Sequence, residues 1–127
     1  FNGHEAVFSD NSRAEFDLVI AATGYQIDFP FISRELLNWQ DGLPRLWLHA
    51  FHPHDDSLFV AGMIQPDSGQ WGLTDWQARL MTQYLGARAS GRAAWFEVLK
   101  TGPQPSLSNG IAYANSARHQ LEVEHYS

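Results

Sequence analysis

The sequence predicts an α/β fold with short strands and two or three helices. Two short apolar segments, residues 18–22 and 58–61, each run into a glycine and favour β-strands. Apolar side chains between Leu73 and Leu85 recur at spacings of three, four, one, three and one residues. Such spacing is typical of one face of an α-helix of about four turns. Strands of this uninterrupted apolar kind are usual in the sheets of α/β proteins.

Composition limits the class of protein. The chain has 127 residues, of which 44% are hydrophobic and 17% are charged, so it can bury the core of one domain. Eight Lys and Arg against 14 Asp and Glu give a formal net charge of −6. This balance argues against nucleic acid or an anionic membrane surface as the main partner. No apolar run approaches the ~20 residues that a transmembrane helix needs.

Three further features concern the setting of the chain. The absence of cysteine excludes disulfides and thiolate metal sites and fits a cytoplasmic location. Aromatic residues make up 13% of the chain, so we expect some rings to line a pocket or to meet another surface. The chain begins at Phe1 without a signal-peptide profile, and we expect it to be a piece of a longer polypeptide.

The N-terminal third is predicted to be extended. Residues 5–16 favour a hairpin with a turn at residues 9–12. Residues 18–22 follow as a continuous apolar run that begins after Asp17 and is closed by Thr23 and Gly24. A run of this kind predicts a strand that is covered on both faces, as in parallel sheets.

The middle of the chain mixes short elements. Residues 32–38 favour a short helix with Ser33 as N-cap, and Leu36 and Leu37 are expected to face inward. Residues 46–51 are predicted to be extended, and residues 58–61 to form a second short strand that ends at a glycine.

The C-terminal half is predicted to be helical and then irregular. Residues 65–72 favour a loop, and the following helix is expected to begin near Thr74, with Asp75 in its first turn and Trp76 in the core. A second helix is predicted over residues 93–100, before Gly102 and Pro103. The tail that follows is expected to be solvated, including its acidic and imidazole side chains, His119, Glu122 and Glu124.

Two blocks of sequence carry a family resemblance. Residues 17–25, which include Ala22-Thr23-Gly24-Tyr25, resemble the ATG-Y segment of the flavin-containing monooxygenases. Residues 58–66, with residues 75–79 after them, are similar to the last flavin-contacting strand, loop and helix of that family. The resemblance covers about residues 5 to 100 and keeps the order of the two blocks.

The resemblance implies a fragment of a fold with two dinucleotide-binding, Rossmann-like domains for FAD and NAD(P). Residues 1–90 would be the C-terminal part of the FAD-binding domain, and residues 91–127 a short helix and extended tail. The glycine-rich turns that the family uses for the FAD and NADPH pyrophosphates have no counterpart in the chain. The chain therefore resembles the C-terminal third of such an enzyme, and we expect it to be inactive alone.

The family's chemistry would follow from its cofactors. NADPH reduces FAD, O₂ adds to give a C4a-(hydro)peroxyflavin, and one oxygen atom passes to an N or S nucleophile or to a ketone. The implied partners are a small-molecule substrate, O₂, the remainder of the parent chain and, as an open alternative, a second copy of the chain. We expect no catalytic acid or base and no metal among these residues.

The candidate cofactor-binding residues lie at the two strand ends. A helix N-terminus carries unpaired N–H groups and positive charge, which suit the electron-rich edge of reduced flavin. The resemblance and this argument together assign seven residues to the cofactor: Thr23, Gly24 and Tyr25 at the first end and Gly62, Gln65, Thr74 and Asp75 at the second. Trp71 is a candidate wall of the substrate pocket.

Other interpretations remain open at this point. The second block would also fit an ordinary strand–loop–helix without ligand, and Tyr25 would fit a core aromatic. A pyridine-nucleotide flavoprotein reductase would typically carry Gly-Asp where this chain has Gly62-Met63. A non-catalytic module that binds a partner through its aromatic surface is a third possibility. The cluster of His and Asp at residues 49–56 invites a metal site, but Pro53 breaks the helix that would gather it, and a solvent-facing connection explains it more simply.

Overall fold

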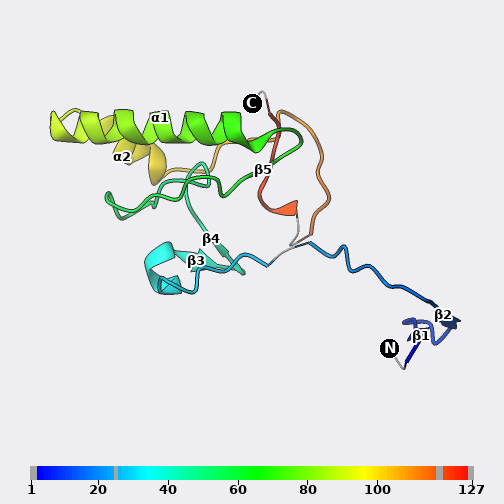
Figure 1. Ribbon diagram of the computed structural model, residues 1–127. Coiled ribbons are helices and arrows are strands. Elements are labelled where there is room, and N and C mark those ends of the chain that lie inside the picture. Colours follow the sequence, from blue (N-terminus) through cyan, green and yellow to red (C-terminus); the bar gives the residue numbers. More distant parts are fainter. Residues whose placement is uncertain (1–2, 25, 117–118, 126–127) are drawn as a thin grey trace.

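The computed structural model describes residues 3–24, 26–116 and 119–125. Within these ranges it is a small α/β structure with two α-helices, one 3₁₀ helix and three two-stranded sheets, and the N-terminal sheet stands apart from the two α-helices (Figure 1). In chain order the elements are β1 (Glu5–Val7), β2 (Arg13–Glu15), the 3₁₀ helix η1 (Arg34–Leu37), β3 (Trp39–Gln40), β4 (Leu43–Pro44), β5 (Gln65–Pro66), α1 (Gln70–Ala89), α2 (Ala94–Lys100) and β6 (Glu122–Val123). β1 pairs with β2 and β3 with β4 in antiparallel fashion, whereas β5 pairs with β6 in parallel.

The predicted N-terminal hairpin is confirmed. Ala6 of β1 lies opposite Ala14 of β2, and the turn between the strands is held by Asp10, whose carboxylate accepts the N–H and the hydroxyl of Ser12 at 2.9 and 2.6 Å. Asn11 at the turn has a φ of 66°, a left-handed conformation that asparagine tolerates.

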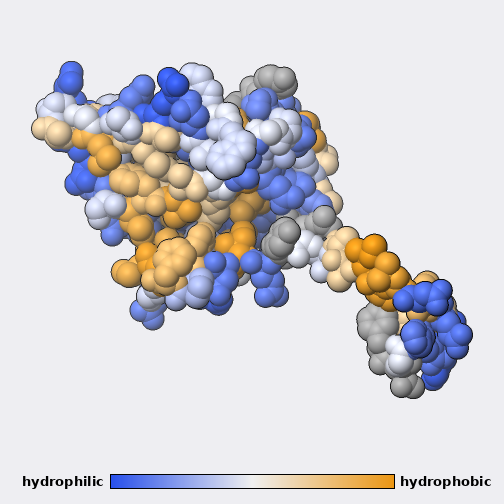
Figure 2. Space-filling model, in the orientation of Figure 1, coloured by the Kyte–Doolittle hydropathy of each residue, from blue (hydrophilic) through white to orange (hydrophobic). Residues whose placement is uncertain are grey.

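Residues 16–24 form an extended arm that joins this hairpin to the rest of the molecule (Figure 1). The predicted covered strand over residues 18–22 is not formed, because no described segment pairs with it. Leu18 is 75% exposed and Ile20 is 79% exposed, and Figure 2 shows the arm as an apolar stretch that stands away from the body. An apolar strand becomes covered only when neighbouring strands and helices are present.

Residues 46–61 depart from the two predicted strands. Leu48 and His49 both have a φ of 53°, so the chain reverses and Trp47 bridges to Phe51 instead of running on. Residues 58–61 are reduced to a single bridge between Phe51 and Phe59. Left-handed residues cannot continue a β-strand, and this local geometry overrides the β-propensity of the side chains.

The short helix at residues 32–38 is a 3₁₀ helix, η1. Ser33 occupies its N-cap position, but its side chain makes no capping hydrogen bond. Leu37 is buried as predicted, whereas Leu36 is 57% exposed, so only one of the two leucines faces inward.

Helix α1 begins at Gln70, earlier than predicted, with Gly69 as its N-cap. Trp71 therefore lies in the helix and not in a loop. The predicted apolar face is only partly correct: Tyr84 is 2% exposed and packs with Leu80 and Met81, but Trp76 is 69% exposed and is not in the core. Helix α2 forms at the predicted place and lies beside α1 (Figure 1).

Two apolar clusters hold the body together. The larger one joins the two helices to the 47–51 turn, and its rings meet edge to face, with Phe51 and Phe96 4.9 Å apart between centroids. The smaller one contains Leu43, Leu46, Met63 and Leu121. Neither helix, over the described residues, is both long and apolar enough to cross a membrane.

The tail is not solvated as predicted. Leu121 and Val123 are buried, and β6 pairs in parallel with β5, so that the Gln65 N–H donates to the Leu121 carbonyl at 2.8 Å. Glu124 is buried as well, and His119 lies 3.7 Å from the Glu122 carboxylate. The alternation of apolar Leu121 and Val123 with acidic residues allows one face of this segment to pack, but only once β5 provides the partner.

Candidate functional site

The chain makes a tight turn at Gly62, which we call the Gly62 turn. Gly62 has a φ of 80°, in the left-handed region. Its N–H donates to Gln77 Oε1 at 2.9 Å, and its carbonyl accepts from Gln70 Nε2 at 2.6 Å. A Cβ at this position would lie 3.4 Å from Gln70 Nε2 and 3.7 Å from Thr74 Oγ1. These distances are ordinary van der Waals contacts, so it is the left-handed backbone conformation that favours glycine here.

Gln77 connects this turn to the reversed segment at residues 47–51. Its Nε2 donates to the Leu48 carbonyl at 3.2 Å, while its Oε1 accepts from Gly62. The Leu48 N–H in turn donates to Gln104 Oε1 at 2.9 Å. The side-chain amides of Gln77 and Gln104 thus bind the carbonyl and the N–H of Leu48, which has a left-handed backbone conformation.

The N-terminus of α1 follows the Gly62 turn and faces solvent. Gly69 is its N-cap, no side chain caps it, and no acidic residue lies in the first turn. The first four N–H groups of a helix have no intrahelical acceptor, and here they belong to residues 69–72, all of which are exposed. A Cβ at Gly69 would meet nothing within 4 Å. The positive end of a 20-residue helix is therefore open to an electron-rich ligand.

This geometry corrects the expected helix start at Thr74 and Asp75. Both residues lie in the second turn, where their amides take part in the helix. The Thr74 hydroxyl donates to the Gln70 carbonyl at 3.1 Å, and the Asp75 carboxylate accepts from Arg79 Nε at 2.7 Å. The free amides are those of residues 69–72, one turn earlier than the sequence predicts.

Gln65 and Trp71 flank the open helix end. Gln65 lies in β5 with its side chain exposed. Trp71 is 87% exposed, so the described residues do not form a pocket behind it. The role of either side chain toward a ligand stays a prediction.

The first strand end lies at the end of the exposed arm. Thr23 and Gly24 are exposed, and Gly24 has a φ of 80°. Tyr25 lies outside the described residues. Among the described residues, no hydrogen bond joins Thr23 or Gly24 to the Gly62 turn. The structure therefore assembles the second strand end but leaves the first one apart.

Comparison with known proteins identifies the family. Residues 1–90 match the family model of flavin-binding monooxygenase-like proteins. The chain belongs to this family. The family that the sequence predicts is thus confirmed.

Three curated relatives illustrate the match. The chain is 34% identical over 94 residues to the 4-hydroxybenzoate brominase (decarboxylating) of Pseudoalteromonas luteoviolacea, covering 73% of this chain and 17% of the relative. It is 31% identical over 101 residues to flavin-containing monooxygenase 2 of Homo sapiens, covering 75% and 19%. Flavin-containing monooxygenase 5 of Homo sapiens is 30% identical over 125 residues, covering 96% and 21%. The chain thus spans about a fifth of the length of these relatives, and no solved structure matches it.

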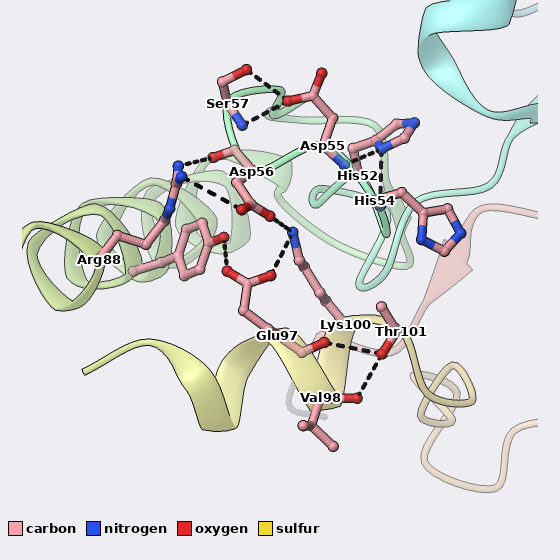
Figure 3. A network of polar contacts seen from close by, with 11 residues as sticks. His52, His54, Asp55, Asp56, Ser57, Arg88, Glu97, Val98, Lys100 and Thr101 are labelled. Carbon is pink, nitrogen blue, oxygen red and sulfur yellow. Dashed lines mark hydrogen bonds and ion pairs between the residues drawn. The ribbon is translucent and has the colours of Figure 1, made fainter. Parts of the chain in front are cut away.

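This flavin-binding monooxygenase-like chain also contains an ionic network around a buried lysine that the sequence did not predict (Figure 3). The Lys100 side chain is 2% exposed, and its ammonium group pairs with the partly exposed carboxylates of Asp56 and, at 2.9 Å, of Glu97. The Tyr84 hydroxyl donates to Glu97, and Arg88 donates to the Asp56 carbonyl at 2.7 Å. The network joins α1, α2 and the loop at residues 52–57. The one available signal was that Lys100 is the single lysine of the chain and follows Glu97 by three residues.

The charges of this network follow from burial and pairing. Burial, with the hydrogen bond to Glu97, raises the pKa of Tyr84 to about 12. Burial would lower the pKa of Lys100, but hydrogen bonds to Asp56 and Glu97 outweigh it and raise that pKa. The hydrogen bond from Lys100 lowers the pKa of Asp56. At neutral pH these pKa directions keep Lys100 and Asp56 charged and the Tyr84 phenol neutral.

The histidine and aspartate cluster is a turn. His52 Nδ1 accepts the N–H groups of His54 and Asp55 at 3.1 and 2.7 Å, and Asp55 in turn accepts from Ser57. Within the described ranges, no group of three or more His, Cys, Asp or Glu side chains is arranged to hold a metal ion. One ring nitrogen of His52, Nδ1, is used here to accept from backbone amides.

Proposed function

We propose that this chain supplies the flavin-facing turn and helix N-terminus of an FAD- and NADPH-dependent monooxygenase, which inserts one oxygen atom of O₂ into an N or S nucleophile or a ketone. The supporting observation is the open, uncapped N-terminus of α1 directly after the Gly62 turn, in a chain that belongs to a flavin-binding family. The names of its relatives favour a monooxygenase over a reductase.

The residues present fit the flavin. Reduced flavin carries negative charge on its pyrimidine edge, and a helix N-terminus stabilises a nearby anion by about 0.3–1 kcal/mol. Gly69 and Gly72 leave the amides of the first turn accessible, since neither position holds a side chain. In this proposal the residue 69–72 amides and the Gln65 side chain contact the pyrimidine edge, and Gly62 allows close approach.

In this proposal the cofactor and the chain have different roles. Bound FAD would supply the transfer of reducing equivalents from NADPH to O₂. The chain's own residues would orient the ring and keep water away from it. The Thr74 and Asp75 side chains are engaged within α1, and the proposal gives neither of them a part in proton transfer.

The arm at residues 16–24 would meet the remainder of a longer parent chain. Its apolar side chains are exposed and its backbone is extended but unpaired, which suits addition to a sheet edge. The relatives are about five times as long as the segment that matches them, so they contain ample chain to supply such a sheet. Thr23, Gly24 and Tyr25 would then reach the flavin, and Trp71 would become a wall of the substrate pocket.

Flavin titration of the chain tests this proposal. FAD should show a perturbed visible spectrum on binding, and anaerobically reduced FAD should bind about two- to fivefold more tightly than oxidised FAD, since the helix end favours negative charge. Affinity will be low because the chain has no pyrophosphate-binding turn. Unchanged spectra of both forms at chain concentrations of about 1 mM would contradict the proposal.

A further inference from the structure

Gln77 makes an unusual pair of contacts. Its side-chain oxygen accepts from the N–H of Gly62 at 2.9 Å, and its side-chain nitrogen donates to the carbonyl of Leu48 at 3.2 Å. Both backbone positions are left-handed, with φ of 80° at Gly62 and 53° at Leu48. One half-buried side chain on the second turn of α1 therefore satisfies two reversed segments that are 14 residues apart in sequence.

Only a carboxamide can make both contacts. Among side chains of this length, glutamine alone carries a hydrogen-bond acceptor and a permanent donor on the same terminal group. Glutamate would accept from Gly62 but would place a negative oxygen against the Leu48 carbonyl, and methionine would do neither. A leucine in the left-handed region is disfavoured, so it persists only where its surroundings hold it. Here Gln77 holds its carbonyl and Gln104 its N–H.

We propose that Gln77 is the positioning residue of the Gly62 turn, which it locks to the Leu48 turn and through it to the aromatic core. The Leu48 turn is fixed to that core because its neighbours Trp47 and Phe51 belong to the larger apolar cluster. The Gly62 turn thereby takes its place relative to the core and not merely relative to α1. That this turn faces the flavin rests on the proposed function.

The test measures hydrogen exchange of single backbone amides by NMR in the 127-residue chain, without flavin. Gln77→Glu keeps the acceptor and loses the donor, and Gln77→Met loses both. In Gln77→Glu we expect Gly62 to keep its protection, because its N–H now meets a carboxylate, while the amides of Ala50 and Phe51 in the Leu48 turn exchange about tenfold faster. In Gln77→Met all three amides should exchange about tenfold faster. Gln83, exposed on the same helix, provides the controls Gln83→Glu and Gln83→Met, which should change none of them.

The different exchange rates expected for the two turns in Gln77→Glu distinguish a positioning role from a general loss of stability. A uniform rise in exchange along α1 in Gln77→Glu, or an unchanged Gly62 amide in Gln77→Met, would overturn the proposal. If Gln77→Met does not fold, Gln77→Glu decides alone. The Gln77 side-chain NH₂ of the wild-type chain must also exchange more slowly than that of Gln83, and equal rates would count against the proposal.

The exchange experiment on Gln77 and the flavin titration can succeed or fail independently. A chain that shows the different responses of the two turns but fails to bind FAD refutes the flavin proposal and leaves the positioning role of Gln77 intact. A chain that binds FAD but lacks the different responses of the Gly62 and Leu48 turns refutes the positioning role of Gln77 and leaves the flavin proposal intact. If both hold, Gln77→Met should weaken FAD binding and Gln83→Met should not.

Discussion

Replacing Gly69 by aspartate should stabilise the chain and weaken flavin binding at the same time. Gly69 has φ −69° and ψ 125°, the extended geometry of an N-cap, and a side chain there would meet nothing within 4 Å. Aspartate is a preferred N-cap whose carboxylate accepts the free amides of the first turn. The same amides are the ones proposed to face the flavin, so the carboxylate would compete with it and repel it.

The expected gain in stability of Gly69→Asp is the sum of two contributions. Exchanging a glycine N-cap for aspartate contributes a few tenths of a kcal/mol, and a negative charge at the helix N-terminus adds about 0.3–1 kcal/mol. The sum, about 0.5–1.5 kcal/mol, corresponds to a rise in melting temperature of roughly 2–6 °C for a chain of this size. The loss of the favourable dipole contact, together with like-charge repulsion, should weaken binding of reduced FAD about fivefold or more.

Two variants serve as controls, with thermal unfolding by circular dichroism and anaerobic flavin titration as the assays. Gly69→Asn caps the helix without a charge, so it should give a smaller gain in stability and a smaller loss of affinity. Gly86→Asp places the same charge in the last turn of α1, where a side chain also meets nothing within 4 Å, and should leave flavin affinity unchanged. A stabilised Gly69→Asp chain with unaltered flavin affinity would show that the amides do not face flavin. An unstabilised one would show that they already have partners.

Three other outcomes follow from the structure. Lys100→Met should lower the free energy of unfolding by about 2–3 kcal/mol, because it leaves the carboxylates of Asp56 and Glu97 without their buried cation. Urea denaturation measures this change. A loss below about 0.5 kcal/mol, the usual size for a surface substitution, would contradict the prediction. Because the pKa of Tyr84 is raised from 10.0 to about 12 on folding, its contribution is present below pH 10 and is lost as the pH rises toward 12. The melting temperature should therefore fall more steeply above pH 10 in the wild-type chain than in Tyr84→Phe, and parallel curves would refute the assignment. Ile20→Asp should change the free energy of unfolding of this chain by less than about 0.5 kcal/mol, since Ile20 is 79% exposed. The same substitution should impair the solubility of a longer parent enzyme. A clearly lower free energy of unfolding for this chain would show instead that the arm packs against it.

Local signals in the sequence predicted local structure well. The hairpin and helix α2 depend on neighbours in sequence, and each forms where expected. The start of α1 was placed about one turn too late, because Thr74 looks like a better N-cap than Gly69 by side-chain type alone. The helix begins where the backbone becomes free to turn, and a glycine permits that without a capping side chain.

Tertiary contacts account for the other failures. Trp76 satisfies the helical period, but among the described residues the apolar packing of α1 is along the face that carries Leu80, Met81 and Tyr84, and Trp76 is 69% exposed. The tail has weak periodicity, yet Leu121 and Val123 find cover because β5 offers an unpaired edge. No pattern within either segment reports which partner lies opposite, so neither outcome follows from the sequence of the segment itself.

The two strand ends of the proposed flavin site differ in how far away their partners lie. The Gly62 turn is held by Gln70 and Gln77, eight and 15 residues further along the chain, so a short piece of sequence is enough to form it. The Ala22-Thr23-Gly24 end pairs with no described segment and stays exposed, and in the proposal its partners come from a longer parent chain. Forming nearby contacts costs less loop-closure entropy than forming remote ones. In the proposed site, the helix end and its turn can therefore be in place before the sheet closes, and the arm would supply the contact that completes it.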